Sequence, residues 1–201
     1  MGAGVAQQLA LTYPDSVIGI HLSGTNPYFG ETPPDLSAAE KIFIAQAEAF
    51  RMQEAAYAMV QGTKPQTLAY GLTDSQAGLA AWIIEKFRSW SDCGGDVEKR
   101  FTRDELLSNV MVYWVTGTIN SLCRLYYETM HSPWPNAGKR VEVPTAIAMF
   151  PKDLVPGPRE WAERQFNVLR WTDMPRGGHF GEMEEPDLLA DDIRAFFRTI
   201  R

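Results

Sequence analysis

Three short apolar runs, at residues 17–22, 143–150 and 167–171, constrain the fold of this chain more than any other feature. None of them alternates cleanly between apolar and polar residues, which is typical of parallel strands that are covered on both faces. Helical patterns precede or follow each run. Strands that alternate with helices predict an α/β protein with a short parallel sheet and flanking helices.

The two ends of the chain carry helical patterns of their own. Residues 2–13 repeat small and apolar side chains at helical spacing, including Val5 and Leu9, and the pattern ends before Pro14. The last helix is expected to begin near Pro186, because proline suits the first helical turn. Its apolar face consists of Leu188, Leu189, Ile193, Phe196, Phe197 and Ile200.

The long segment between the first two runs shows only helical patterns, bounded by expected linkers at 26–34 and 132–138. A helical insert between two strands of a parallel sheet is expected to lie over the carboxyl ends of the strands, where such sheets bind ligands. We therefore predict a core formed by residues 1–31 and 139–201 and a large helical cap formed by residues 32–138. Three pairs fit a capping box at a helix start: Ser37 with Glu40, Thr73 with Gln76 and Thr102 with Glu105.

The composition limits the classes of function. With 201 residues and 45% hydrophobic residues the chain can bury a sizeable core, and its net charge of -6 argues against nucleic-acid binding, which needs clustered Lys and Arg. No apolar run approaches the roughly 18 residues of a membrane span, and no signal peptide is visible. Cys93 and Cys123 form no metal or redox motif, so we expect reduced thiols and a cytoplasmic location.

His179 and Asp153 are the first candidates for chemistry. His179 follows Gly177 and Gly178, whose backbone freedom can place an imidazole in a crevice, and an imidazole titrates near neutral pH. Alone, His179 could be a turn residue, and Asp153, just past the second apolar run, a solvated acid or a helix cap. Because parallel strands end at one sheet edge, we expect the two to meet, so that the carboxylate orients the imidazole as in an α/β-hydrolase triad.

Tyr57 and Tyr126 are the candidates in the helical insert. A phenol in a dry cap could donate a hydrogen bond to a developing alkoxide. Taken singly, each is more simply explained as a partly buried aromatic residue. Tyr127 follows Tyr126 directly, so the spacing leaves open which of the two faces a ligand.

Two other polar features are expected to be structural. His21 lies within an apolar strand and predicts a core histidine with a hydrogen-bond partner. Glu182, Glu184 and Glu185 follow His179 and predict a solvated acidic face at a helix N-terminus. No His or Cys joins them at the spacing of metal ligands.

With these residues identified, the chain resembles the microsomal-type epoxide hydrolases, the branch that includes juvenile hormone epoxide hydrolases. The resemblance spans nearly all of the chain and is specific only when its motifs are taken together. These motifs are Arg-Gly-Gly-His-Phe at 176–180, Val-Pro-Thr at 143–145, Gly-Leu-Ala-Ala-Trp-Ile-Ile-Glu-Lys-Phe at 78–87, Asn-Val-Met-Val-Tyr-Trp at 109–114 and Thr-Gly-Thr-Ile at 116–119.

The resemblance implies a partial α/β-hydrolase fold and an enzyme that adds water to a small apolar epoxide and forms a vicinal diol, without a cofactor or a metal. It implies that His179 is the general base and Asp153 its orienting acid, and that Tyr57 and Tyr126 hold the epoxide oxygen. In the family an Asp attacks the epoxide carbon and forms an ester, which water activated by the histidine then cleaves.

The chain departs from the family at its first residue. The family's nucleophile stands in a Gly-Gly-Asp-Trp-Gly turn, and Met1 falls where the Trp would stand, so we expect the Asp directly upstream of Met1 and an inactive, poorly soluble isolated chain. Two alternatives stay open. One is a non-catalytic protein that binds an apolar ligand, and the other is a different α/β hydrolase, such as an esterase or a dehalogenase.

Overall fold

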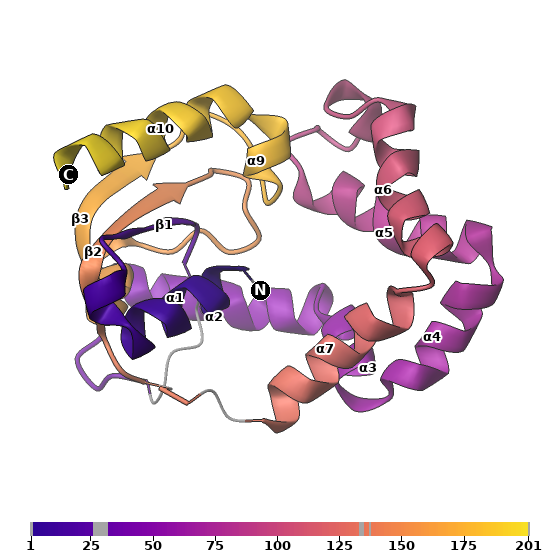
Figure 1. The fold of residues 1–201 in the computed structure, drawn as a ribbon, viewed down its shortest axis with the longest axis horizontal. Helices are drawn as coiled ribbons and strands as arrows, with labels where there is room; N and C mark the ends of the chain where they lie inside the picture. The colour runs from indigo at the N-terminus through magenta and orange to yellow at the C-terminus, as the bar shows by residue number, and fades with distance from the viewer. Residues whose placement is uncertain (1, 26–31, 133–134, 137, 201) are drawn as a thin grey trace. The chain divides into compact units, whose positions relative to one another are not determined.

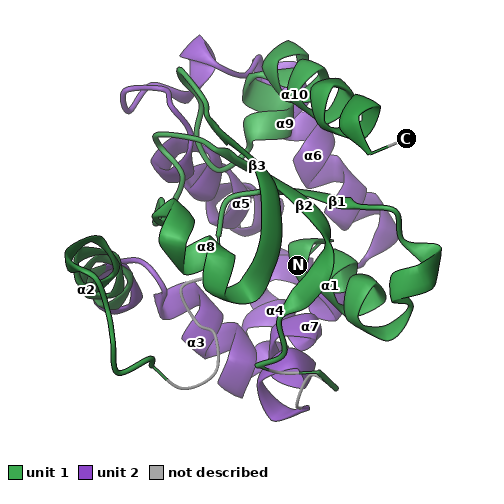
Figure 2. Ribbon diagram, turned by 90° about the vertical axis from the view of Figure 1, so that its left-hand side faces the viewer, with its two compact units in different colours: residues 1–49, 135–201 green, residues 50–134 purple. Residues whose placement is uncertain are grey.

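The computed structural model describes residues 2–25, 32–132, 135–136 and 138–200. The chain divides into two compact units (Figure 2): residues 1–49 with 135–201 form one unit, and residues 50–134 form the other. Each unit is described by itself. The two expected linkers lie partly outside the described residues, and Met1 lies outside them.

A parallel three-stranded sheet forms the centre of the first unit (Figure 1). Its strands β1 (Ile20–Ser23), β2 (Val141–Met149) and β3 (Phe166–Asp173) lie in the order β1-β2-β3. The three apolar runs are therefore confirmed as parallel strands. The first strand is shorter than its run: it begins at Ile20, and Ile18, between the 3-10 turn at Pro14–Ser16 and the strand, is 63% exposed.

Helices cover both faces of this sheet. Ile147 and Met149 belong to a core cluster with Ala10 of α1 (Gly2–Thr12) and Ala162 of α8 (Arg159–Gln165). Ala148, which lies between them on β2, belongs instead to a second cluster with residues of α10 (Pro186–Thr199). Successive side chains of a strand point to opposite faces, so this alternation buries β2 on both sides, as the lack of an apolar–polar alternation predicts.

A buried polar network ties α10 to the sheet. The Asp192 carboxylate accepts hydrogen bonds from Arg170 Nε at 2.8 Å and Thr172 Oγ1 at 2.7 Å, and His21 Nε2 lies 2.8 Å from Asp192 Oδ2. Burial alone would raise the pKa of this carboxyl group, but the hydrogen bonds from its three partners outweigh burial and hold the pKa below its ordinary value. His21 is thus a core histidine with a partner, as predicted.

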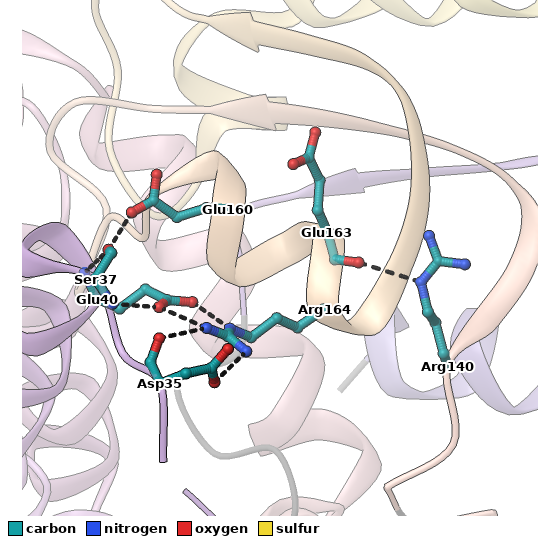
Figure 3. A network of polar contacts seen from close by, with 7 residues as sticks. All are labelled: Asp35, Ser37, Glu40, Arg140, Glu160, Glu163 and Arg164. Carbon is teal, nitrogen blue, oxygen red and sulfur yellow. Dashed lines mark hydrogen bonds and ion pairs between the residues drawn. The ribbon is translucent and has the colours of Figure 1, made fainter. Parts of the chain in front are cut away.

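A second polar cluster joins the start of α2 (Ala38–Gln53) to α8 (Figure 3). Arg164 Nη2 donates to Glu40 Oε2 at 3.0 Å, and Arg164 Nη1 donates to Asp35 Oδ1 at 3.1 Å. This hydrogen bonding with Arg164, foremost among several causes, lowers the pKa of Glu40. The predicted capping box of Ser37 and Glu40 is present, with both backbone N–H groups bonded at 2.9 and 3.1 Å.

These contacts explain where the compact units divide. Residues 32–49 group with the sheet, so the first division falls after residue 49, beyond the expected linker at 26–34. The second division falls after residue 134, within the expected linker at 132–138. The ring of Phe43 packs against Trp161 at a centroid distance of 5.7 Å, which adds an apolar contact to the ion pairs. The role of the remaining helices as a cap stays a prediction.

The second unit is helical, with α3 (Ala56–Thr63), α4 (Pro65–Asp74), α5 (Gln76–Trp90), α6 (Arg103–Thr116) and α7 (Ile119–His131). Its core includes Leu72, Leu79, Val110, Ile119 and Cys123. The capping box of Thr102 and Glu105 is confirmed. The one predicted at Thr73 and Gln76 is wrong, because α4 continues to Asp74 and Ser75 caps α5 by accepting from Gly78 N–H at 3.0 Å. No helix among the described residues is long and apolar enough to cross a membrane.

Candidate active site

Asp153 and His179 meet at the carboxyl edge of the sheet, as the order of the strands predicts. Asp153 lies beyond β2 and His179 beyond β3, and His179 Nδ1 lies 2.7 Å from Asp153 Oδ1. The carboxylate side chain is 17% exposed and the imidazole 40% exposed, so solvent and ligands can reach the pair. A carboxylate on Nδ1 favours the tautomer that keeps the lone pair on Nε2, the form that can accept a proton from water.

The Asp153 carboxylate is held on more than one side. Leu154 N–H donates to Asp153 Oδ1 at 2.7 Å, and Asp153 N–H donates to the Phe150 carbonyl at 3.2 Å. Gly24, directly after β1, has φ +82°, and a Cβ atom placed there would lie 2.5 Å from Asp153 Oδ2. Only a glycine therefore combines this backbone conformation with so close an approach to the carboxylate.

The loop that carries His179 is attached to the loop that carries Asp153. Lys152 N–H donates to the Gly177 carbonyl at 3.1 Å, and Lys152 forms an isolated parallel bridge with Gly178. Gly177 has φ +102°, and a Cβ there would lie 2.7 Å from the ring of Phe150, which is fully buried. Gly177 thus allows the loop that carries His179 to pack closely against the ring of Phe150.

The acidic residues after His179 do not form the solvated face that the sequence predicts. Glu182 is exposed, but Glu184 and Glu185 are buried. Glu184 accepts hydrogen bonds from two backbone N–H groups of the histidine loop, and Glu185 accepts one from Arg176 Nε at 2.7 Å. A glycine-rich turn leaves backbone N–H groups that need acceptors, and this need is the signal that could have identified Glu184 from the sequence.

Tyr57 on α3 and Tyr126 on α7 pack together in the second unit, with ring centroids 5.9 Å apart and an interplanar angle of 80°. Trp90 lies 5.2 Å from Tyr57, and the Lys86 ammonium lies 5.1 Å from the Tyr57 ring. Tyr127 is exposed and stacks on His131 instead, at 4.0 Å. The structure therefore selects Tyr126 over Tyr127 as the partner of Tyr57.

Burial is the main cause of the raised pKa values of the Tyr57 and Tyr126 phenols. Burial, together with the neighbouring Tyr126 phenol, raises the pKa of Tyr57 well above its ordinary value. Burial also raises the pKa of Tyr126, and the hydrogen bond with Tyr57 offsets that only in part. Both phenols thus stay protonated and can act as hydrogen-bond donors across the physiological pH range.

Polar groups also lie in the core next to the tyrosines. Cys123, one turn before Tyr126 on α7, is fully buried and its Sγ donates to Gln61 Oε1 at 3.4 Å. Burial raises the pKa of the Cys123 thiol, so it is an unreactive core group. Cys93 is also buried and without a disulfide. Within the described residues no group of three or more His, Cys, Asp or Glu is arranged to hold a metal ion.

The chain is similar to known proteins over nearly its whole length. It is 36% identical to Epoxide hydrolase 1 of Sus scrofa, covering 97% of this chain and 48% of that protein. It is 35% identical to Juvenile hormone epoxide hydrolase 2 of Ctenocephalides felis, covering 96% of this chain and 46% of that protein. The solved epoxide hydrolase of Aspergillus niger matches all of this chain and 50% of its own, with a TM-score of 0.82 and 32% identity.

The chain belongs to the epoxide hydrolase family. Its three-stranded sheet with flanking helices is part of the α/β-hydrolase fold of that family. The chain spans about half the length of the curated relatives that it matches. No family model matches the chain.

Proposed function

We propose that this chain supplies the water-activating base, its orienting acid and the two oxygen-binding tyrosines of an epoxide hydrolase. The single observation that carries the proposal is the 2.7 Å contact between His179 Nδ1 and Asp153 Oδ1 at the carboxyl edge of the sheet. The protonated pair of Tyr57 and Tyr126 supports it, because opening an epoxide requires donors to the ring oxygen. The substrate is a small apolar epoxide, and the product is the vicinal diol.

The first chemical step opens the ring. An aspartate carboxylate attacks one epoxide carbon, a carbon–oxygen ester bond forms, and the bond from that carbon to the ring oxygen breaks. The ring oxygen takes the departing electron pair and receives a proton donated by a phenol group. The attacking aspartate is part of the proposal, and we expect it in the portion of the relatives' length that this chain does not span.

The second step returns the free carboxylate. His179 takes a proton from a water molecule while the water oxygen attacks the ester carbonyl carbon. The tetrahedral intermediate collapses, its bond to the diol oxygen breaks, and that oxygen receives the proton held by His179. The second proton of the water leaves as the carboxylate re-forms and returns to the phenolate left by the first step. Asp153 keeps the imidazole oriented and stabilises its charged form, so the histidine can accept and then release the proton.

The proposal is tested with the protein translated from the upstream in-frame sequence through Arg201. The upstream codons should encode Gly-Gly-Asp before Met1, and the purified protein should convert styrene oxide to its diol. His179→Gln should still form the ester but not hydrolyse it, so the peptide with the upstream Asp should gain the mass of the epoxide. A stop codon directly upstream, or an active protein that never forms the ester, would contradict the proposal.

Two controls separate the other hypotheses. Esterase activity that persists unchanged after Tyr57→Phe and Tyr126→Phe would favour a different α/β hydrolase, because only ring opening needs the phenols. A stable protein that retains an apolar molecule but turns over neither epoxides nor esters would favour a non-catalytic binding protein.

We also propose a biological role and a cellular location for the protein. Hydration removes the alkylating group of an epoxide, so we include detoxification among the roles of this protein. A cytoplasmic location is supported by Cys93 and Cys123, which are both free and buried. Fractionation of cells that express the protein would test this location.

A further inference from the structure

The backbone on both sides of His179 is bonded to one buried carboxylate. Glu184 Oε2 accepts from Gly178 N–H at 3.1 Å, and Glu184 Oε1 accepts from Phe180 N–H at 3.2 Å. Glu184 is 9% exposed. Each of its two oxygen atoms therefore accepts from the backbone N–H of one of the two residues next to the histidine.

This arrangement is independent of the contact between His179 and Asp153. Asp153 bonds to the imidazole ring, whereas Glu184 bonds to the backbone and so fixes the direction in which the Cα–Cβ bond of His179 leaves the loop. Hydrogen bonds to an ionised acceptor are roughly twice as strong as neutral ones. The short helix α9 (Gly181–Glu184) turns the chain back, and its Glu184 N–H donates to the Phe180 carbonyl at 2.8 Å.

We propose that Glu184 is a positioning residue for His179: its carboxylate fixes the backbone before and after the histidine, through Gly178 N–H and Phe180 N–H, and thereby holds the imidazole in the orientation that activates water. This inference rests on the proposed function for its kinetic consequence. Because His179 acts only in hydrolysis of the ester, loosening its loop slows the second step and leaves ring opening unaffected.

The variants are chosen so that charge and packing are controlled. Glu184→Gln keeps the shape but replaces one acceptor oxygen with an NH₂ group, which cannot accept from a backbone N–H. Glu184→Asp keeps both oxygens on a shorter side chain and should have an intermediate effect. Glu182→Gln is the matched control, because Glu182 lies on the same short helix and is exposed.

The first measurement does not depend on activity. The sample is the full-length protein that contains this chain, labelled with ¹⁵N-histidine. Its His179 Nδ1–H proton should resonate far downfield because it is hydrogen-bonded to the Asp153 carboxylate. Loss of this resonance in His179→Gln assigns it to His179. The resonance should shift or broaden in Glu184→Gln and stay unchanged in Glu182→Gln. An unchanged resonance in Glu184→Gln would overturn the proposal.

The second measurement separates the two chemical steps. Misplacing a catalytic group by about 1 Å can cost roughly a hundredfold in rate, so in Glu184→Gln ester hydrolysis should slow about ten- to a hundredfold. The kcat and KM values should then fall together, kcat/KM should change little, and the ester should accumulate. Equal slowing of both steps would overturn the positioning role. If the unsubstituted protein forms neither ester nor diol, the proposed function fails, and the histidine resonance still decides the role of Glu184.

Discussion

At the scale of single residues, burial determines what Tyr57 and Tyr126 of the helical unit can do. A phenol titrates near pH 10 in water, and the raised pKa values of Tyr57 and Tyr126 move proton loss above that point. A donor to an epoxide oxygen has to carry its proton when the ring opens. The burial of these side chains therefore keeps both phenols in the protonated form that can donate a hydrogen bond to the epoxide oxygen.

Removing either phenol should slow ring opening. A donor aimed at developing charge is typically worth a hundredfold or more in rate. We expect Tyr57→Phe and Tyr126→Phe each to reduce the rate of ester formation by about that factor, and the double variant to lose measurable turnover. Rapid-quench kinetics with mass detection of the ester gives this rate.

Tyr127→Phe is the matched control for this experiment. Its ring is exposed and stacks on His131, so its hydroxyl group has no part in the pair. A hundredfold loss in Tyr127→Phe, with full activity in Tyr126→Phe, would reverse the assignment of the two neighbours.

Some features of the site can be predicted from the sequence, and others depend on side-chain orientation and burial, which the sequence pattern leaves open. The meeting of Asp153 and His179 follows from strand order alone, because parallel strands end at one edge. The choice between Tyr126 and Tyr127 does not follow, since a helix register cannot be fixed when adjacent residues have the same side chain. The burial of Glu184 was missed because three acids within four positions are most often a solvated face.

At the scale of elements, one buried carboxylate adds polar contacts between α10 and two strands of the sheet to their apolar packing. Asp192 is buried, and its partners come from β1 and β3. Removing one partner of a buried ion pair typically costs about 3–5 kcal/mol. We expect Asp192→Asn to lower the free energy of unfolding by about 3 kcal/mol at pH 7, measured by urea denaturation.

The pH dependence of this loss has a definite sign. The folded-state pKa of Asp192 lies below the ordinary value of 3.8, so its contribution is present above that value and is lost as the pH falls through the folded pKa. The stability difference between the two proteins should therefore shrink in acid below about pH 4. Asp191→Asn, whose side chain is 78% exposed, should change the stability little at either pH.

The sequence predicts the elements better than their ends. The strands follow from apolar runs, and the capping boxes at Ser37 and Thr102 follow from local side-chain chemistry. The same pattern failed at Thr73 because a better-placed acceptor, Ser75, lies two residues on. The grouping of residues 32–49 with the sheet could not be read from local patterns, because the ion pairs of Arg164 join residues that are far apart in the sequence.

At the scale of the whole molecule, the edge of the sheet formed by β1 is the surface that we expect to promote self-association. β1 is an edge strand, paired only with β2 among the described residues. Nearby apolar side chains are exposed: Val5 by 50%, Leu9 by 49% and Ile18 by 63%. Edge strands with exposed apolar neighbours associate readily.

We therefore expect the 201-residue chain, expressed by itself, to be poorly soluble and to self-associate as its concentration rises. Sedimentation velocity should show this, and Leu9→Lys with Ile18→Lys should shift the population toward monomer. A concentrated sample that remains monomeric and gives a well-dispersed NMR spectrum would contradict this expectation.

The pairing of β1 with β2 has a consequence for synthesis on the ribosome. Ile20 pairs with Thr145, and the whole of residues 50–134 is made between them. Closing so long a loop is entropically costly, and such long-range pairing is slow. The helical unit can fold before β2 has been synthesised and can pair with β1. Nascent chains should therefore expose β1 without its β2 neighbour while residues 24–140 are synthesised, and a chaperone would matter most in this interval.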